Sequence, residues 1–234
     1  MKPYLVTSIE AGRLPRWIPI LLCAVYVVAG LFGRDPWRTD DAAGFGIAHT
    51  MATGSAIDWL VPNVHGALAP EGGPLPFWLG AIGIRVAGVL NGMLGGVLGL
   101  SGVSVSADLA FRTVAAVGLA LSLAMLWYAA YAFARRPEIQ PDDPFGAAAS
   151  RTDFARAVAD TALLAMLATF GLLARVHETT GNAAQVTWIA LYLFGLGHLP
   201  QRPRVGALLV GLAIAATLLT RGIPLAVVLA FTMA

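Results

Sequence analysis

The sequence predicts an all-α protein: a polytopic bundle of transmembrane helices with a large external first loop that contains juxtamembrane helices. Of the 234 residues, 58% are hydrophobic and only 12% are charged, about half the charged fraction of a soluble domain. The apolar runs are long and continuous rather than alternating, which favours helices over barrel strands. The net charge of +2 gives no indication of a nucleic-acid partner. The single cysteine, Cys23, excludes a disulfide within these residues.

Five apolar segments approach the roughly 20 residues that a helix needs to cross a bilayer. They lie near residues 17–32, 113–133, 157–174, 183–199 and 205–220. A sixth, residues 223–234, is too short to cross. We therefore expect residues 1–234 to be the N-terminal transmembrane module of a longer protein. The basic residues before the first segment fit a cleaved signal peptide or an uncleaved anchor, and the membrane character of the remaining chain favours the anchor.

Residues 75–100 are also apolar, but an arginine, an asparagine and seven glycines dilute their hydrophobicity. Cytoplasmic loops collect Lys and Arg, so the arginines decide whether this segment crosses. If the N-terminus is cytoplasmic and residues 75–100 do not cross, the basic loops around 135–156 and 202–204 are both cytoplasmic. We therefore predict that residues 75–100 lie along the membrane or re-enter it.

Glycines recur at four-residue spacing in the same segment. Gly88, Gly92 and Gly96 follow this spacing, and Gly95 and Gly99 repeat it. Small residues at such intervals let two helices approach closely. We expect these glycines to pack against a neighbouring helix.

Residues 33–108 then form one external loop, too long for a plain connector. Phe45, Ala48 and Ala52 share one face of a short helix, which suits an element lying at the membrane interface. The same arrangement places four carboxylates in one outer compartment. They are Asp40, Asp41, Glu71 and Glu178.

Thr39, Asp40 and Asp41 directly follow the first span and its Arg34–Arg38 connection. One interpretation is a helix start, because Thr can cap a helix and acids favour its positive end. The other is a general base, because a carboxylate just above the membrane can accept the proton of an incoming hydroxyl. These residues alone leave both interpretations open.

Glu71 is followed by two glycines and lies among three prolines, directly before Phe77 and Trp78. The glycines permit a tight turn, and Pro74 or Pro76 can begin a helix. A surface turn with an incidental acid would explain part of this segment. A carboxylate held rigidly for binding a metal ion or a polar head group explains its unusual composition better.

The His177-Glu178-Thr179-Thr180 segment follows the third predicted span. It is not a zinc-protease motif, because residue 181 is Gly rather than His. Emergence of a span into a polar loop explains it as well as a functional site does. Arg112, Asp160 and Arg221 lie near span ends, where long polar side chains reach the interface by default.

Three segments in this order resemble the first external loop of membrane glycosyltransferases with the C-type fold. They are Asp40-Asp41, the Asp-Trp-Leu-Val-Pro-Asn of residues 58–63, and the Glu-Gly-Gly-Pro-Leu-Pro-Phe-Trp of residues 71–78. The resemblance is closest to the protein O-mannosyltransferase and lipid A aminoarabinose transferase group. Residues 218–222, Leu-Leu-Thr-Arg-Gly, resemble a Leu-Thr-Lys-Gly segment of that group. The likeness covers nearly the whole chain and is most specific in residues 33–78.

The resemblance implies roles for three acids. Asp40 matches the catalytic base, Glu71 the glutamate near a metal ion or phosphate, and Glu178 the acid of the second external loop, although His-Glu replaces the usual Asp. This chain departs from the aminoarabinose transferases at Gly72, where they commonly carry a lysine that meets the donor phosphate. The family also implies juxtamembrane helices in the first external loop.

The resemblance therefore implies an inverting glycosyltransferase that moves a sugar from polyprenyl phosphate to a lipid, glycan or protein acceptor. Its site would face the periplasm from a bacterial inner membrane, surrounded by membrane lipids. Asp40 would accept the acceptor proton, while Arg34, Arg38 and Arg221, or a divalent metal ion at Glu71, would stabilise the leaving phosphate. Residues 1–234 alone would be inactive.

Two alternatives remain open at this point. A transporter or flippase-like protein would carry polar residues deep inside several spans, whereas the polar residues of this chain gather in its loops. A glycosyltransferase-like scaffold without activity would explain why Gly72 replaces a phosphate-binding lysine.

Overall fold

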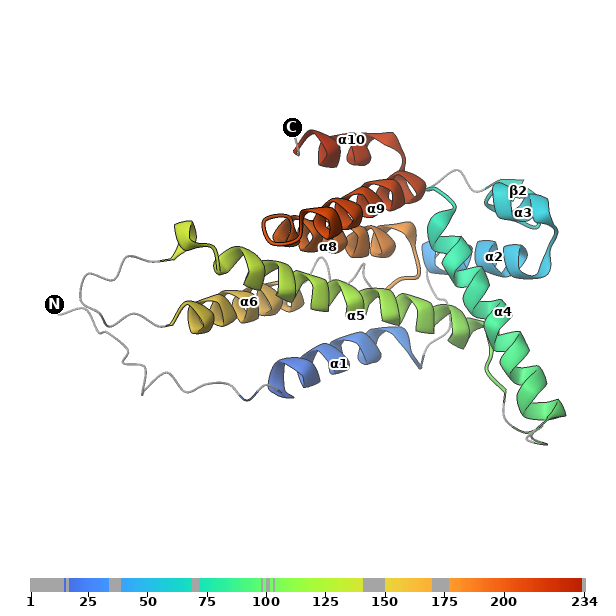
Figure 1. Cartoon of the computed structure of the whole chain (residues 1–234). Coiled ribbons are helices and arrows are strands. Elements are labelled where there is room, and N and C mark those ends of the chain that lie inside the picture. The colour runs from blue at the N-terminus through green and yellow to red at the C-terminus, as the bar shows by residue number, and fades with distance from the viewer. Residues whose placement is uncertain are drawn as a thin grey trace.

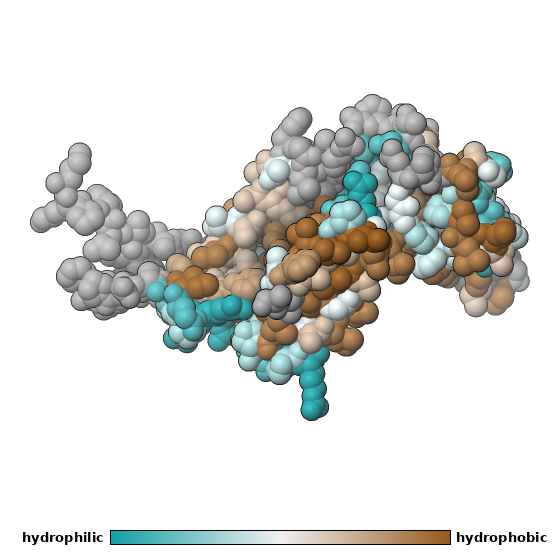
Figure 2. Space-filling view, turned by 90° about the horizontal axis from the view of Figure 1, so that it is seen from above, coloured by the Kyte–Doolittle hydropathy of each residue, from teal (hydrophilic) through white to brown (hydrophobic). Residues whose placement is uncertain are grey.

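The structure, a computed structural model, describes residues 17–33, 39–68, 72–97, 104–140, 150–169 and 177–232, together with residues 15, 99 and 102. These residues are mostly helical, with one antiparallel pair of two-residue strands. Three of the described helices, α4, α5 and α9, are long and apolar enough to cross a membrane. This confirms the predicted all-α class. Figure 2 shows hydrophobic side chains over much of the middle of one face, with hydrophilic side chains in separate patches.

The helices follow the predicted order along the chain. The elements are α1 (Trp17–Leu31), α2 (Thr39–Thr53), α3 (Ala56–Leu60), β1 (Asn63–Val64), β2 (Ala67–Leu68), α4 (Leu75–Gly96), α5 (Ala107–Ala134), the 3-10 turn η1 (Pro137–Ile139), α6 (Arg151–Ala168), α8 (Gly181–His198), α9 (Pro203–Arg221) and α10 (Ile223–Phe231). Serine caps set two of the starts: the Ser106 hydroxyl accepts from the Leu109 amide, and the Ser150 hydroxyl from the Asp153 amide. Consequently α5 and α6 begin earlier than the apolar runs that predicted them.

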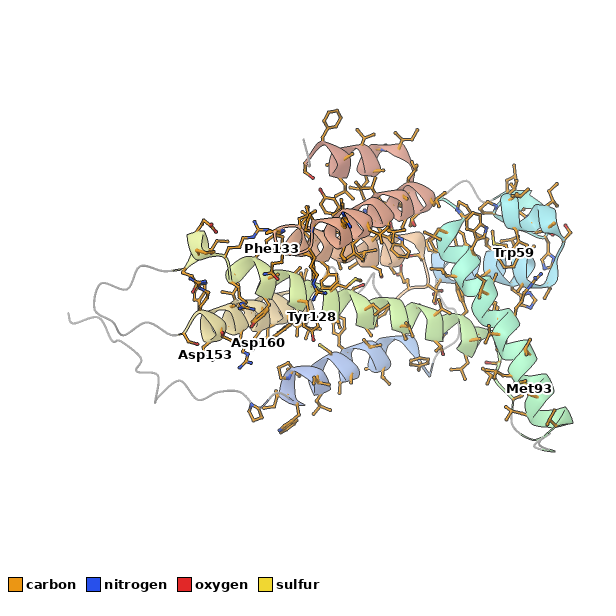
Figure 3. The ribbon with its side chains drawn as sticks, in the orientation of Figure 1. Trp59, Met93, Tyr128, Phe133, Asp153 and Asp160 are labelled. Carbon is orange, nitrogen blue, oxygen red and sulfur yellow. The ribbon has the colours of Figure 1, made fainter. Side chains whose placement is uncertain are left out.

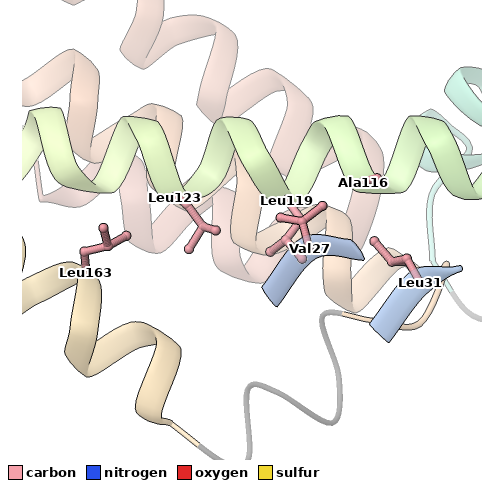
Figure 4. Packing of buried hydrophobic residues seen from close by; sticks show 6 residues of the cluster. All are labelled: Val27, Leu31, Ala116, Leu119, Leu123 and Leu163. Carbon is pink, nitrogen blue, oxygen red and sulfur yellow. The ribbon is translucent and has the colours of Figure 1, made fainter. Parts of the chain in front are cut away.

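Helix α5 is the centre of the bundle (Figure 1). It packs against α1, α6 and α8, while α9 lies on α8 and α10 lies on α9. A buried apolar cluster joins α1, α5 and α6 (Figure 4). It consists of Val27 and Leu31 from α1, Ala116, Leu119 and Leu123 from α5, and Leu163 from α6. The α5 members recur at three- and four-residue spacing, which places them on one helical face.

The two ends of the bundle differ in chemistry. One end of the bundle contains the C-termini of α1, α6 and α9 and the N-termini of α5 and α8 (Figure 1). Helices α2 to α4 lie at this same end. We call it the carboxylate end because it holds Asp40, Asp41, Asp108 and Glu178. The opposite end is the basic end, which holds Arg135, Arg136, Arg151, Arg156, Arg202 and Arg204.

Helix α4 does not run alongside the bundle but crosses the beginning of α5 at the carboxylate end (Figure 1). The crossing depends on two glycines. A Cβ atom at Gly80 would collide with the Phe111 ring, and one at Gly83 would lie 2.6 Å from a methyl group of Val114. The two backbones can approach only because neither position carries a side chain.

The expectation that Gly88, Gly92, Gly96 and their neighbours pack against a helix was wrong for the described structure. A Cβ atom at any of them would meet nothing within 4 Å. The reason is that α4 crosses α5 near its own beginning, so its second half, which contains Met93, extends past the bundle (Figure 3).

Helix α2 also packs differently from the prediction. Its buried apolar residues are Ile47, Ala48 and Met51 rather than the Phe45, Ala48 and Ala52 face. Ile47 and Met51 contact Phe77 and Ala81 of α4. The face shifted because α2 packs on another helix of the same loop, whereas the prediction assumed a flat membrane interface.

The α4–α5 crossing predicts opposite effects for two identical substitutions. Gly80→Ala should lower the free energy of unfolding by about 1–3 kcal/mol, because it over-packs the contact with Phe111. Gly88→Ala should leave stability unchanged or raise it by up to about 1 kcal/mol, because alanine is the better helix former and meets open space. Thermal unfolding of the purified protein in detergent measures both. Equal effects at the two positions would show that α4 does not cross α5 at Gly80.

Candidate functional site

Asp41, in the first turn of α2, is the most constrained acid at the carboxylate end. Its side chain is fully buried. One carboxylate oxygen accepts hydrogen bonds from the backbone N–H and the hydroxyl of Thr179, at 2.8 and 2.6 Å. The other lies 3.4 Å from Nη2 of Arg112. Asp41 therefore joins α2, the 177–180 segment and α5.

Arg112, in the second turn of α5, completes this network. It is 2% exposed, so the expectation that it reaches the membrane interface was wrong. Its Nε donates to both carboxylate oxygens of Asp108 at 2.9 and 3.0 Å, and Nη1 donates to the Leu31 carbonyl at 3.0 Å. That carbonyl is one of those that the last turn of a helix leaves without an intrahelical donor. The guanidinium thus contacts two acids, Asp108 and Asp41, and caps α1.

Asp40 precedes Asp41 and is exposed. Successive helical residues point about 100° apart, so burying one acid of the pair leaves the other outside the network. The structure therefore shows which of the two acids is buried, and the sequence alone could not. The buried Asp41 fixes the start of α2, whereas Asp40 is exposed.

Glu178 is 2% exposed and lies in a segment held at both sides. Before it, His177 Nε2 donates to the Tyr26 carbonyl of α1 at 2.7 Å. After it, Thr179 is bonded to Asp41. A Cβ atom at Gly44 would collide with the Thr179 carbonyl, so α2 lies directly against this segment. His177, to which the sequence assigned no role, positions the predicted acid.

The turn after Glu71 is docked on the end of α9. Gly72 has φ +95°, and the Gly73 N–H donates to the Thr220 carbonyl at 2.8 Å. A Cβ atom at Gly73 would collide with the Leu219 carbonyl. The two glycines therefore permit both the turn and its close approach to α9. Two of the segments that carry the family resemblance, 71–78 and 218–222, thereby meet in space.

The remaining residues that the sequence predicted lie in different parts of the chain. Arg221 is exposed at the last position of α9, at the carboxylate end. Arg34, Arg38 and Glu71 lie outside the described residues. Pro74 and Pro76 stand at the start of α4, as predicted.

The Asp-Trp-Leu-Val-Pro-Asn segment has a structural explanation. The Asp58 carboxylate accepts from the Asn63 amide at 3.1 Å and from the backbone N–H and hydroxyl of Ser55 at 2.7 and 3.0 Å. The Asn63 amide, followed by the two Ser55 donors, lowers the pKa of Asp58 below its ordinary value. The Trp78 indole donates to the Trp59 carbonyl. These contacts form the cap of α3 and attach it to α4 (Figure 3).

A cavity of about 80 Å³ lies between α4, α5 and α8, below the 177–180 segment. Most of its wall is apolar, and its polar groups come mainly from that segment. The lining residues are Pro76, Leu79, Phe111, Val114, Ala115, Gly118, Leu119, Glu178, Thr179, Thr180, Ala183, Ala184, Thr187 and Trp188. Residues 178–180 therefore contribute polar groups to a mainly apolar cavity.

Within the described ranges, no three His, Cys, Asp or Glu side chains come together in a way that could hold a metal ion. Glu71, the acid expected near a metal ion, lies outside those ranges.

Comparisons with protein-family models, with curated proteins and with solved structures found no match to this chain. The resemblance of residues 40–78 and 218–222 to a glycosyltransferase group therefore stays a hypothesis.

The network predicts unequal effects on stability for the two neighbouring acids. Asp41→Asn should lower the free energy of unfolding by about 1.5–3 kcal/mol, because it removes a buried charged partner of Arg112 and Thr179. Asp40→Asn should change stability by no more than about 0.5 kcal/mol, as is usual for exposed positions. Thermal unfolding of both variants in detergent at neutral pH provides the measurement. A small effect at both positions would show that Asp41 does not hold α2 to the bundle.

Proposed function

We propose that this chain is the N-terminal module of an integral membrane glycosyltransferase. The enzyme transfers a sugar from polyprenyl phosphate to a hydroxyl of a lipid, glycan or protein acceptor at the outer face of the membrane, with inversion. The observation that carries the proposal is the grouping at the carboxylate end. The exposed acid Asp40 directly precedes Asp41 of the buried network. That network also holds the segment in which Glu178 lines an apolar cavity.

The cavity favours a lipid-linked donor over a soluble one. Its walls come from α4 and α5, two helices apolar enough to cross a membrane, and from α8. Its polar groups lie at the end where the helices begin. An amphiphile whose head lies at this end, with its chain among the helices, matches that distribution. A soluble nucleotide sugar has no apolar chain that would pack against the apolar wall of the cavity.

In the proposed reaction, Asp40 accepts the proton of the acceptor hydroxyl as its oxygen attacks the anomeric carbon. The bond from that carbon to the phosphate oxygen breaks on the opposite face, which inverts the configuration. Polyprenyl phosphate leaves as an anion, so no general acid is needed. Arg221, together with Arg34 and Arg38, supplies the positive charge that stabilises it, and a divalent metal ion at Glu71 would add to that charge.

The transporter alternative gains no support from the buried polar groups between the described helices. The Ser122 hydroxyl donates to Thr187 at 2.9 Å, and the Trp127 indole donates to Asp160 at 2.7 Å. Asp160 lies on α6 toward the basic end (Figure 3). These groups bond to one another across α5, α8 and α6, so they hold the helices together and do not outline a polar path. The activity measurement described below distinguishes an enzyme from an inactive scaffold.

The proposed orientation can be tested with single cysteines in a Cys23→Ala background. Leu68, Val97 and Ile139 are 73%, 79% and 49% exposed and lie in the hairpin, after α4 and in η1. If α4 does not cross the membrane, cysteines at 68 and 97 should react with an impermeant reagent from the outside, and a cysteine at 139 only after the membrane is opened. Reaction of residue 97 with the inner side would show that α4 crosses. Reaction of residues 68 and 139 from one side would contradict the grouping of the acids.

The proposed base predicts a large loss of activity without loss of structure. Asp40→Asn in the full-length enzyme should reduce sugar transfer about 10²–10⁴-fold, as expected for a lost general base. Asp153→Asn is the matched control, because Asp153 also lies in a first helical turn but at the basic end (Figure 3). Transfer from a radiolabelled polyprenyl-phosphate sugar in membranes is measured at equal expression. Equal activities of the two variants would remove Asp40 from the mechanism.

A further inference from the structure

Thr180 differs from the other buried threonines of the described structure. Thr50, Thr179, Thr187, Thr217 and Thr220 each donate a hydroxyl hydrogen bond, to Gly46, Asp41, Gly118, Ala213 and Ala216 respectively. Thr180 is 8% exposed, yet its hydroxyl has no hydrogen-bond partner among the described residues. A buried hydroxyl without a partner is unfavourable, so its presence needs an explanation.

The place of Thr180 in the fold makes this more unusual. It is the N-cap of α8, where a threonine hydroxyl commonly accepts from an amide of the first turn. With φ −116° and ψ 166°, its backbone has the extended conformation of a cap, but its side chain makes no capping bond. The bonds of Thr179 to Asp41 hold the preceding residue in place. The Thr180 hydroxyl therefore lacks the partner that is usual at an N-cap.

The side chain of Thr180 lines the cavity between α4, α5 and α8. At about 80 Å³, the cavity exceeds the roughly 10–15 Å³ that one water requires. Glu178 lines the same cavity. A carboxylate oxygen can accept a bond from a hydroxyl group, and a threonine hydroxyl can both donate and accept. The polar end of the cavity is thus suited to a neutral, hydroxyl-bearing group.

We propose that Thr180 is a specificity-determining residue whose hydroxyl bonds a hydroxyl group of the sugar carried by the donor. The inference rests on the proposed glycosyltransferase function and assigns the sugar, rather than the phosphate, to the end of the cavity formed by Glu178 and Thr180. The phosphate lies away from Glu178.

The test compares binding of two lipids to the full-length protein and to two variants. The lipids are undecaprenyl phosphate and undecaprenyl phosphate carrying mannose, glucose or 4-amino-4-deoxyarabinose, with the sugar that the unaltered protein binds best used throughout. Thr180→Val removes the hydroxyl at nearly constant volume, and Thr180→Ser retains it. We expect Thr180→Val to weaken binding of the sugar-carrying lipid about tenfold, with no change for undecaprenyl phosphate. Thr180→Ser should bind both lipids like the unaltered protein.

Thermal unfolding without ligand provides the second measurement. Since the hydroxyl has no partner among the described residues, Thr180→Val should keep or raise the unfolding temperature. A lower temperature would show that the hydroxyl is bonded within the protein, through a buried water for example, and would overturn the assignment. Equal weakening for both lipids, or none for either, would overturn it while leaving the proposed function intact. Failure of the unaltered protein to bind either lipid would overturn the proposed function, and the assignment with it.

Discussion

The buried pair of Asp41 and Arg112 is the interaction on which the carboxylate end depends. Removing two charges from water is costly, and the cost is offset only where each charge has good partners. Each charge has such partners, because Thr179 donates twice to Asp41 while Asp108 and the Leu31 carbonyl accept from Arg112. One ion pair thus connects the end of α1, the starts of α2 and α5, and the segment before α8.

This connection distinguishes two neighbouring acids of one short sequence. Asp41 is buried within the packed network, and its neighbour Asp40 is exposed on the same helical turn. The segment that bonds Asp41 presents Glu178 and Thr180 to the cavity. A rigid support for a few reactive or binding groups is what positioning of reactants requires.

Glycines set the geometry of the turn at residues 72–74 and of α4. Gly73 brings the turn after Glu71 onto α9, and Gly80 and Gly83 let α4 cross α5. Each requirement comes from a close approach of two backbones. The later glycines of α4 meet nothing, so identical residues in one helix have different physical meanings. Only their distance from the crossing point distinguishes them.

The sequence by itself determined the helical class, the order of the helices and several of their starts, including that of α4 at Pro74 and Pro76. Those features depend on hydropathy, periodicity and capping, which act between near neighbours. The tertiary structure decided which of two adjacent acids is buried, that Arg112 is internal, and that Thr180 faces a cavity. Asp41 and Arg112 are separated by 71 positions, and burial arises only when such distant segments pack together. No local pattern contains that information.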